Sequence, residues 1–309
     1  MTSRRAATLW LSATLLAGGC ATLGNSGRSL VPTRHEARVG PFSVRTNSPL
    51  PADAPALRQL SALERQVQAT LGVRVDPQAP PIEVYILDDR EAFARFLAFH
   101  HPEFPPRRAF FVSQGGQRVV YTFLGDRLLE DLRHEATHAL LNAAIGDVPL
   151  WLDEGLAEYF EGTDDRGGVN AEHLGRLPVD LAAGWGPDLR RLEGLTDVRQ
   201  MTPRDYRESW AWVHYLLTGP VAGRTSLLAY LADIQARPPE TRLSDRIPEG
   251  ADSPDRRLLA HLDRLKEKPV AANPAEEPTF RLQDGATEPP VPEPRRRGFL
   301  GRIGRLIGL

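Results

Sequence analysis

The chain lacks several features that mark large classes of protein. It holds one cysteine, Cys20, among 309 residues, so no intramolecular disulfide can form. Its formal net charge is -2 at pH 7, which gives no basic footprint for a nucleic-acid partner. We find no internal repeat. The balance of 41% hydrophobic and 25% charged residues is that of a globular protein with a core of moderate size.

The only marked apolar run at the N-terminus is too short to span a bilayer as a durable anchor. It follows a basic start, MTSRR, and ends at AGGC, an order typical of an export signal over 1–19. The small residues before Cys20 resemble the lipobox of bacterial lipoproteins, with Leu16 one place earlier than usual. The resemblance implies that Cys20 becomes the lipidated first residue. An ordinary signal peptide with an incidental cysteine is the alternative.

This interpretation places the mature protein in the cell envelope, held by lipid on Cys20. Ala21, rather than aspartate, follows the cysteine, so we expect the periplasmic face of the outer membrane if the cell has one. Residues 20–40 are expected to form a polar tether, and 269–294 a disordered proline-rich linker. The basic amphipathic tail, 295–309, is either a second membrane contact through an interfacial helix or a disordered basic end.

Residues 41–268 alternate between strand-like and helix-like patterns. Strands are expected at PFSVRT and PIEVYIL, and helices at PALRQLSALERQVQATLG and DREAFARFLAF. AFFVSQGGQRVVYTFL places two strand-like runs around Gly115-Gly116, a strong hairpin signal. Helical patterns follow at 126–146, 153–161, 203–218, 221–236 and 252–267. The order predicts an α+β domain, with a small mixed sheet and hairpin packed on the helix at 126–146 and a mostly helical C-terminal half.

The segment RHEATH stands out because the chain has only eight histidines. His134 and His138 are four apart in a predicted helix, so they lie on one face, one turn apart. Two imidazoles so placed can bind one zinc ion, which then needs a third protein ligand and an open position for water if it is catalytic. Glu135 lies about 100° round the helix, where a general base belongs. Chance, or a solvated polar helix face, is the alternative.

HEATHALLN followed by PLWLDEGLAEYFEG resembles the gluzincin zinc metallopeptidases, above all the peptidase MA-like domains of exported bacterial proteins. Their pattern is HExxH, a loop, a proline, a tryptophan–leucine pair and E-G-x-A. The resemblance implies a zincin-like fold for 41–268, with His134, His138 and Glu154 as zinc ligands and Glu135 as the base. The metzincin pattern, which needs a third histidine soon after a glycine, does not follow His138.

Further site residues are expected from the two later helices. Glu158 is expected either to accept the outer N–H of His134 or to face solvent. Gluzincins usually add a tyrosine or histidine that stabilises the oxyanion, and DYRESWAWVHYLL offers Tyr206, His214 and Tyr215. Similar domains tend to have a tyrosine at the front of this helix, which favours Tyr206. His214 and Tyr215 fit satisfied core positions.

Together these features predict a zinc metallopeptidase of gluzincin type that hydrolyses peptide or protein substrates in the cell envelope. Glu135 is expected to take a proton from water activated by Zn²⁺ and to protonate the leaving amine. The sheet edge in the hairpin at 109–123 is expected to bind substrate backbone by strand addition. Two alternatives stay open: a non-catalytic envelope scaffold with a structural or vestigial zinc site, and an amidase acting on peptidoglycan peptides.

Overall fold

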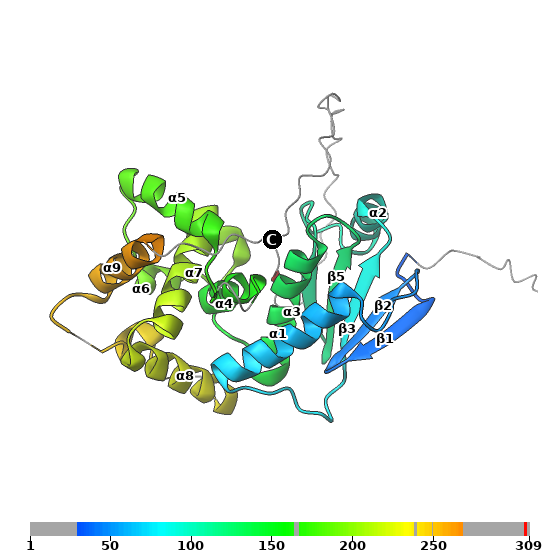
Figure 1. Ribbon diagram of the computed structural model, residues 1–309, viewed down its shortest axis with the longest axis horizontal. Helices are drawn as coiled ribbons and strands as arrows, with labels where there is room; N and C mark the ends of the chain where they lie inside the picture. Colours follow the sequence, from blue (N-terminus) through cyan, green and yellow to red (C-terminus); the bar gives the residue numbers. More distant parts are fainter. Residues whose placement is uncertain (1–29, 164–166, 238–239, 249, 268–305, 308–309) are drawn as a thin grey trace, which may run out of the picture.

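A mixed β-sheet forms the N-terminal part of the protein (Figure 1). The computed structural model describes residues 30–163, 167–237, 240–248, 250–267 and 306–307. The strands are β1 (His35–Val39), β2 (Phe42–Thr46), β3 (Ile82–Leu87), β4 (Phe110–Gln114), β5 (Gln117–Phe123) and β6 (Leu306–Ile307). Their order is β1-β2-β3-β5-β4-β6. The pairs β2–β3 and β3–β5 are parallel, and β1–β2, β4–β5 and β4–β6 are antiparallel.

Helices cover both faces of this sheet. Helices α1 (Pro55–Leu71) and α3 (Leu128–Ala144) contribute to the main core together with Val84 and Val120. Helix α2 (Arg90–His100) packs in a second, aromatic cluster. Tyr85 and Tyr121, which directly follow Val84 and Val120 in their strands, belong to this second cluster. Because successive strand residues point to opposite faces, α2 lies across the sheet from α1 and α3.

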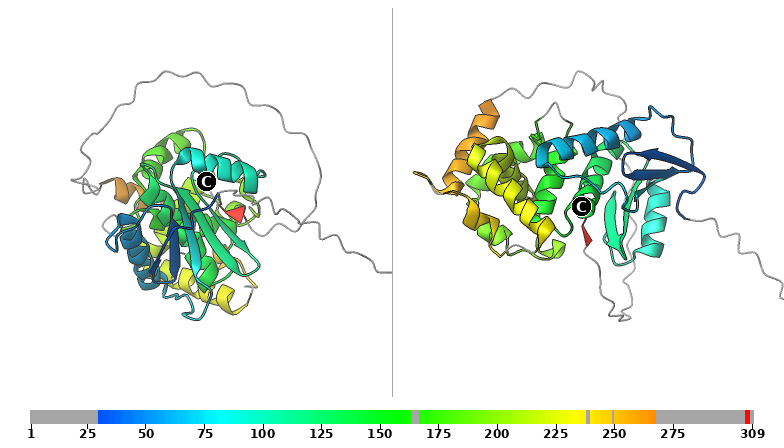
Figure 2. Two further views of the ribbon diagram at one scale, coloured as in Figure 1. Left: turned by 90° about the vertical axis from the view of Figure 1, so that its right-hand side faces the viewer. Right: turned by 90° about the horizontal axis from the view of Figure 1, so that it is seen from below.

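The C-terminal half of the described chain is helical and lies beside the sheet, with α1 and α3 between the two halves (Figures 1 and 2). Its helices are α4 (Leu150–Glu161), α5 (Ala171–Ala182), α6 (Leu189–Leu192), α7 (Pro203–Thr218), α8 (Val221–Ala236) and α9 (Pro254–Glu267). Short 3-10 turns lie at Val198–Gln200 and Leu243–Arg246. Helix α4 packs between α3 and α7, and this packing brings together the two segments that carry the motif residues.

The predicted α+β class is confirmed, and so are the hairpin and the helices at 203–218 and 221–236. One boundary was wrong: strand β1 lies inside the predicted tether, 20–40. Its pairing with β2 turns at Gly40, whose φ of 52° suits glycine. Helix α3 begins at Leu128, two residues after the start of the predicted helical pattern, with Arg127 in the cap position and no side-chain cap. Helices α5 and α6 were not expected.

The chain ends add little to the described structure. Residues 1–29, with Cys20, and most of 268–309 lie outside it, so the signal, lipidation, linker and interfacial-helix predictions are not tested. From the tail, only Leu306 and Ile307 are described, and they pair as a strand with Val112 and Phe111 of β4. Among the described helices, none combines the length and apolar character needed to cross a membrane.

Candidate metal centre

Helix α3 carries the HExxH segment in a fully buried stretch. Its residues from Leu132 to Leu141 are all buried, because the helix lies between the sheet, α1 and α4. His134 and His138 are therefore interior groups, 2% and 0% exposed, which argues against a solvated polar helix face. Their rings lie one turn apart with centroids 5.0 Å from each other. Buried histidines need partners for both ring nitrogens, so what surrounds them decides their role.

Glu154 of α4 meets both rings. Its Oε2 atom lies 3.7 Å from Nε2 of His134 and 3.7 Å from Nε2 of His138. Two ligand atoms that are each about 2.0–2.1 Å from a tetrahedral zinc ion lie roughly 3.3–3.4 Å apart, so the observed spacing is slightly wider than that of a loaded site. The structure therefore brings together the three predicted ligands, in a buried group that could hold a metal ion.

These three side chains fit a cation because they satisfy nothing else. Both ring nitrogens of His134 and of His138, and both carboxylate oxygens of Glu154, are buried without a hydrogen-bond partner in the described part of the chain. Burial opposes a charged imidazole, yet the carboxylates of Glu154 and Glu161 raise the pKa of His134 well above its usual 6.5. The pKa of His138 is also raised, by Asp153 and Glu154 against burial. The surroundings thus favour positive charge at this point.

A second carboxylate faces the outer nitrogen of each ring. Nδ1 of His138 lies 3.3 Å from Oδ1 of Asp153, and Nδ1 of His134 lies 3.8 Å from Oε2 of Glu161. Such outer carboxylates orient metal-binding imidazoles and increase their basicity. The sequence left two alternatives for Glu158, this role or a position facing solvent, but the residue is 4% exposed and its Oε2 atom lies 3.0 Å from Nε2 of His173. Glu158 is four residues after the ligand Glu154. Glu161 is about one helical turn further along α4, and its carboxylate is the one that lies near the outer nitrogen of His134.

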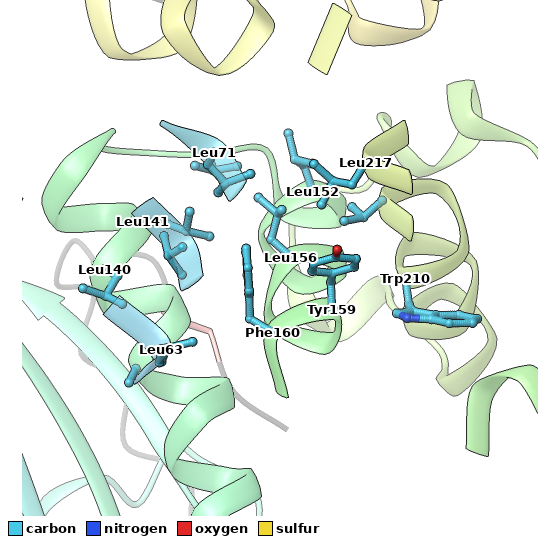
Figure 3. Close-up of a cluster of buried hydrophobic side chains, with 14 of the residues drawn as sticks. Leu63, Leu71, Leu140, Leu141, Leu152, Leu156, Tyr159, Phe160, Trp210 and Leu217 are labelled. Atoms are coloured by element: carbon cyan, nitrogen blue, oxygen red, sulfur yellow. The ribbon is translucent and has the colours of Figure 1, made fainter. Parts of the chain in front are cut away.

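Hydrophobic packing sets the position of α4. Leu156 and Phe160 lie on the side of α4 toward Leu71 of α1 and Leu141 of α3, while Leu152 lies beside Leu217 of α7 and Tyr159 lies toward Trp210 of α7 (Figure 3). Trp151, Leu152, Leu156 and Phe160 are all at most 1% exposed, so these four positions of α4 are fully packed. The helix bearing Glu154 is therefore held from both sides.

Polar contacts fix the same helix at its C-terminal end. Arg133, next to the motif histidine, donates from Nε to the carbonyl oxygens of Phe160 at 2.9 Å and Glu161 at 3.1 Å. Its Nη2 donates to Gly162 O at 2.7 Å. A cation at the last carbonyls satisfies acceptors that have no partner within the helix and complements the helix dipole. Sequence reasoning missed this residue, although a basic residue beside the motif was visible.

Close contact between α4 and α7 depends on Gly155, directly after the ligand Glu154. A Cβ atom there would lie 2.6 Å from the backbone oxygen of Ser209 and 2.8 Å from Cγ2 of Val213. The E-G pair in the sequence is thus explained by packing: only glycine lets the two helices approach this far.

Glu135 is in an environment suited to exchanging a proton near neutral pH. It is 2% exposed, and its Oε2 atom has no hydrogen-bond partner among the described residues. Burial raises the pKa of Glu135 to about 7, while His134 and His138 oppose the shift. A bound cation would act in the same direction as the two histidines and lower the pKa of Glu135. A carboxylate that no structural contact occupies, beside a possible metal site, is available for chemistry.

Tyr206 lies near the centre, in the second turn of α7. Its pKa is raised by burial and then by the charges of Glu154 and Glu158. Its side chain lines a cleft of about 580 Å³ together with Glu158 and Glu161, and neither Glu135 nor any of the three possible ligands lines that cleft. The alternatives His214 and Tyr215 are buried core residues, and Nδ1 of His214 lies 2.9 Å from Nε2 of His261.

Comparison with known proteins finds one matching family model, and its description names no activity. A family model described as "Protein of unknown function (DUF1570)" matches residues 129–240. The match covers a little more than a third of the chain, from the first turn of α3 to just beyond α8, and so includes all three possible ligands. No curated protein matches the chain.

Proposed function

We propose that the protein is a zinc-dependent metallopeptidase that acts on peptide bonds in the cell envelope. The observation that carries the proposal is the buried, otherwise unsatisfied group His134, His138 and Glu154 with Glu135 beside it. Two imidazoles and one carboxylate are a ligand set that zinc uses when it keeps a position open for catalysis. A structural zinc site, by contrast, is usually closed by four protein ligands, and none of its neighbours needs to act as a base.

Each residue has a distinct part in this reaction. His134, His138 and Glu154 would hold a zinc ion, which would supply a Lewis acid able to make water nucleophilic near neutral pH. Glu135 accepts the proton released as water attacks the peptide carbonyl and then delivers it to the leaving amine. Tyr206 donates its phenolic hydrogen to the developing oxyanion, and its raised pKa keeps that hydrogen in place at neutral pH.

The edge of β4 is the proposed binding site for the substrate backbone. Strand β4 pairs with β5 on one side and contacts α3, so a peptide along the part of its other edge that β6 leaves unpaired would extend the sheet close to the motif helix. Leu306 and Ile307 pair with this edge at Phe111 and Val112. A substrate that uses the same positions must compete with the C-terminal strand.

The location proposed for this activity is the outer face of the cytoplasmic membrane or the periplasmic face of an outer membrane, through lipid on Cys20. What supports it is the order of basic start, apolar run and small residues before the cysteine. The 295–309 tail is proposed as a weaker second contact with anionic lipid.

The test of function is metal-dependent hydrolysis. The purified mature chain is stripped with a chelator, reloaded with one equivalent of Zn²⁺, and incubated with unstructured peptides, envelope proteins and peptidoglycan stem peptides. The proposal expects new termini, detected by mass spectrometry, only after reloading. Bound zinc without cleavage of any substrate in this panel would favour the scaffold, and cleavage of stem peptides alone would favour the amidase.

A further inference from the structure

Arg107 is a half-buried cation whose donors lack acceptors. Its Nε and Nη1 atoms are buried and have no hydrogen-bond partner in the part of the chain that is described. The guanidinium carbon lies 5.0 Å from the ring centroid of Phe104, so an aromatic side chain covers one face. Burial lowers the pKa of Arg107, because a charge inside the fold is less well solvated than one in water. Leaving such donors unpaired is costly unless an acceptor arrives from outside the fold.

The charge of Arg107 acts directly on the candidate metal centre. Against the effect of burial, Glu135, Tyr206 and Glu154 raise the pKa of Arg107. In return, Arg107 lowers the pKa of Glu135 and of Tyr206. The proposed base, one metal ligand and the proposed oxyanion donor therefore all lie within electrostatic reach of one guanidinium.

The neighbouring Arg108 has a structural role, which sets Arg107 apart. Nε and Nη2 of Arg108 donate to the carboxylate of Asp131 on α3, at 2.8–3.0 Å. Asp131 is one turn before His134, so this bidentate pair ties the segment that enters β4 to the motif helix. Arg107 is thus held beside the centre by its neighbour, while its own Nε and Nη1 stay available.

We propose that Arg107 binds a carboxylate of the substrate next to the scissile bond and so determines which peptides are cleaved. This inference rests on the proposed peptidase function. The planar guanidinium presents parallel N–H donors as the pairs Nε/Nη2 and Nη1/Nη2, which match the two oxygens of a carboxylate, and each pair contains one of the unpartnered donors of Arg107. The carboxylate is either the C-terminus of the peptide or an acidic side chain, and the two sources share the same recognition chemistry.

The first experiment measures binding of small carboxylates to the zinc-loaded protein by titration calorimetry. The probes are the dicarboxylates from malonate to adipate and the monocarboxylate butyrate. One carboxylate reaches the metal and the second reaches Arg107. We expect the best dicarboxylate to bind about 10- to 100-fold more tightly than butyrate, as for one charge-assisted hydrogen-bonded pair. Equal affinity for all probes would overturn the proposal.

Variants assign the effect to the residue. Arg107→Gln should abolish the preference, and Arg107→Lys should retain only part of it, because lysine keeps the charge but not the fork. Arg95→Gln is the matched control: it removes one positive charge from the exposed side of α2 and should leave the preference intact. Zinc content and melting temperature of each variant show that fold and metal site persist. A preference that survives Arg107→Gln would overturn the assignment.

A second set of probes separates the two carboxylate sources. Zinc-loaded Glu135→Gln protein, which keeps its ligands, is titrated with one peptide in four forms: free or amidated C-terminus, with or without an acidic residue. Preference for the free terminus indicates an exopeptidase, and preference for the acidic residue indicates an acidic-site endopeptidase. Either preference must vanish with Arg107→Gln, or the proposal fails. Because these assays do not require turnover, an Arg107-dependent preference in a protein that cleaves nothing would contradict only the proposed function.

Discussion

Oδ1 of Asp153 lies 3.3 Å from Nδ1 of His138, while the other nitrogen of that ring, Nε2, lies 3.7 Å from Glu154. Two consecutive residues of α4 therefore lie next to the two nitrogens of one imidazole. Glu161 stands in the same relation to His134. Both rings are held between an inner carboxylate and an outer one, which is the arrangement expected of metal-binding histidines rather than of core histidines.

Removal of an outer carboxylate should weaken metal binding without removing a ligand. Asp153→Asn and Glu161→Gln are each expected to lower zinc affinity about 10- to 100-fold, because the imidazoles lose orientation and basicity. Glu158→Gln is the comparison, since Glu158 contacts His173 and should change affinity less. Competition with a fluorescent zinc chelator measures all three. A larger loss of zinc affinity with Glu158→Gln than with Glu161→Gln would show that Glu158, not Glu161, is the outer carboxylate of His134.

Gly155 should be intolerant of even one added carbon. Gly155→Ala places Cβ 2.6 Å from the backbone oxygen of Ser209, so α4 and α7 must separate. We expect a loss of roughly 1–3 kcal/mol in the free energy of unfolding, as for an overpacked core. Gly175→Ala, on the exposed side of α5 with no atom within 4 Å, is the control and should be neutral or stabilising by up to about 1 kcal/mol. Urea denaturation of the metal-free forms measures both free energies of unfolding.

Metal binding should release protons above the pH at which ordinary histidines have lost theirs. The pKa values of His134 and His138 are raised above 6.5 in the metal-free protein by nearby carboxylates, so the ion must displace protons at pH values above 6.5, where ordinary histidines are mostly neutral. A raised folded pKa stabilises the fold below the unfolded value, and that contribution is lost as pH rises through the folded value. The metal-free protein should therefore lose stability over this range. Calorimetry in buffers of different ionisation enthalpy counts the protons, and a count near zero just above pH 6.5 would contradict the raised pKa values.

Membrane attachment should depend on Cys20. Cells producing the wild type are expected to retain the protein in the membrane fraction, and Cys20→Ser should release it or leave an unprocessed precursor. Intact-mass spectrometry should find lipid only on the wild type. Equal solubility of the two proteins, with no lipid mass on either, would show that the segment 1–19 is an ordinary signal or has another role.

Local patterns were enough to predict the elements that position the metal group. Helical periodicity located α3, α7 and α8, and Gly115-Gly116 located the β4–β5 turn. Strand β1 was missed because its residues are polar and exposed, although Gly40 between two short alternating runs was a usable hairpin signal. The His–His–Glu group followed from spacing and family resemblance.

The remaining site residues depend on tertiary contacts that no local pattern records. Asp153 and Glu161 become partners of the histidines only when α4 packs against α3 at one particular rotation. Arg133 and Arg107 belong to different segments, and only the folded chain shows that the first is saturated with acceptors and the second is not. Tyr206 was selected by resemblance, and the structure places it in one cleft with Glu158 and Glu161.

The most direct measurement compares Glu135→Gln with wild type for both zinc content and hydrolysis of the substrate panel. The variant keeps all three ligands, so zinc should stay near one ion per chain while the rate of hydrolysis falls about 10²- to 10⁴-fold through loss of the base. Glu154→Ala should lose zinc and activity together, and Glu130→Gln, a surface glutamate on the same helix, should change neither. Unchanged hydrolysis in Glu135→Gln, or a wild type that binds no zinc, would contradict the account.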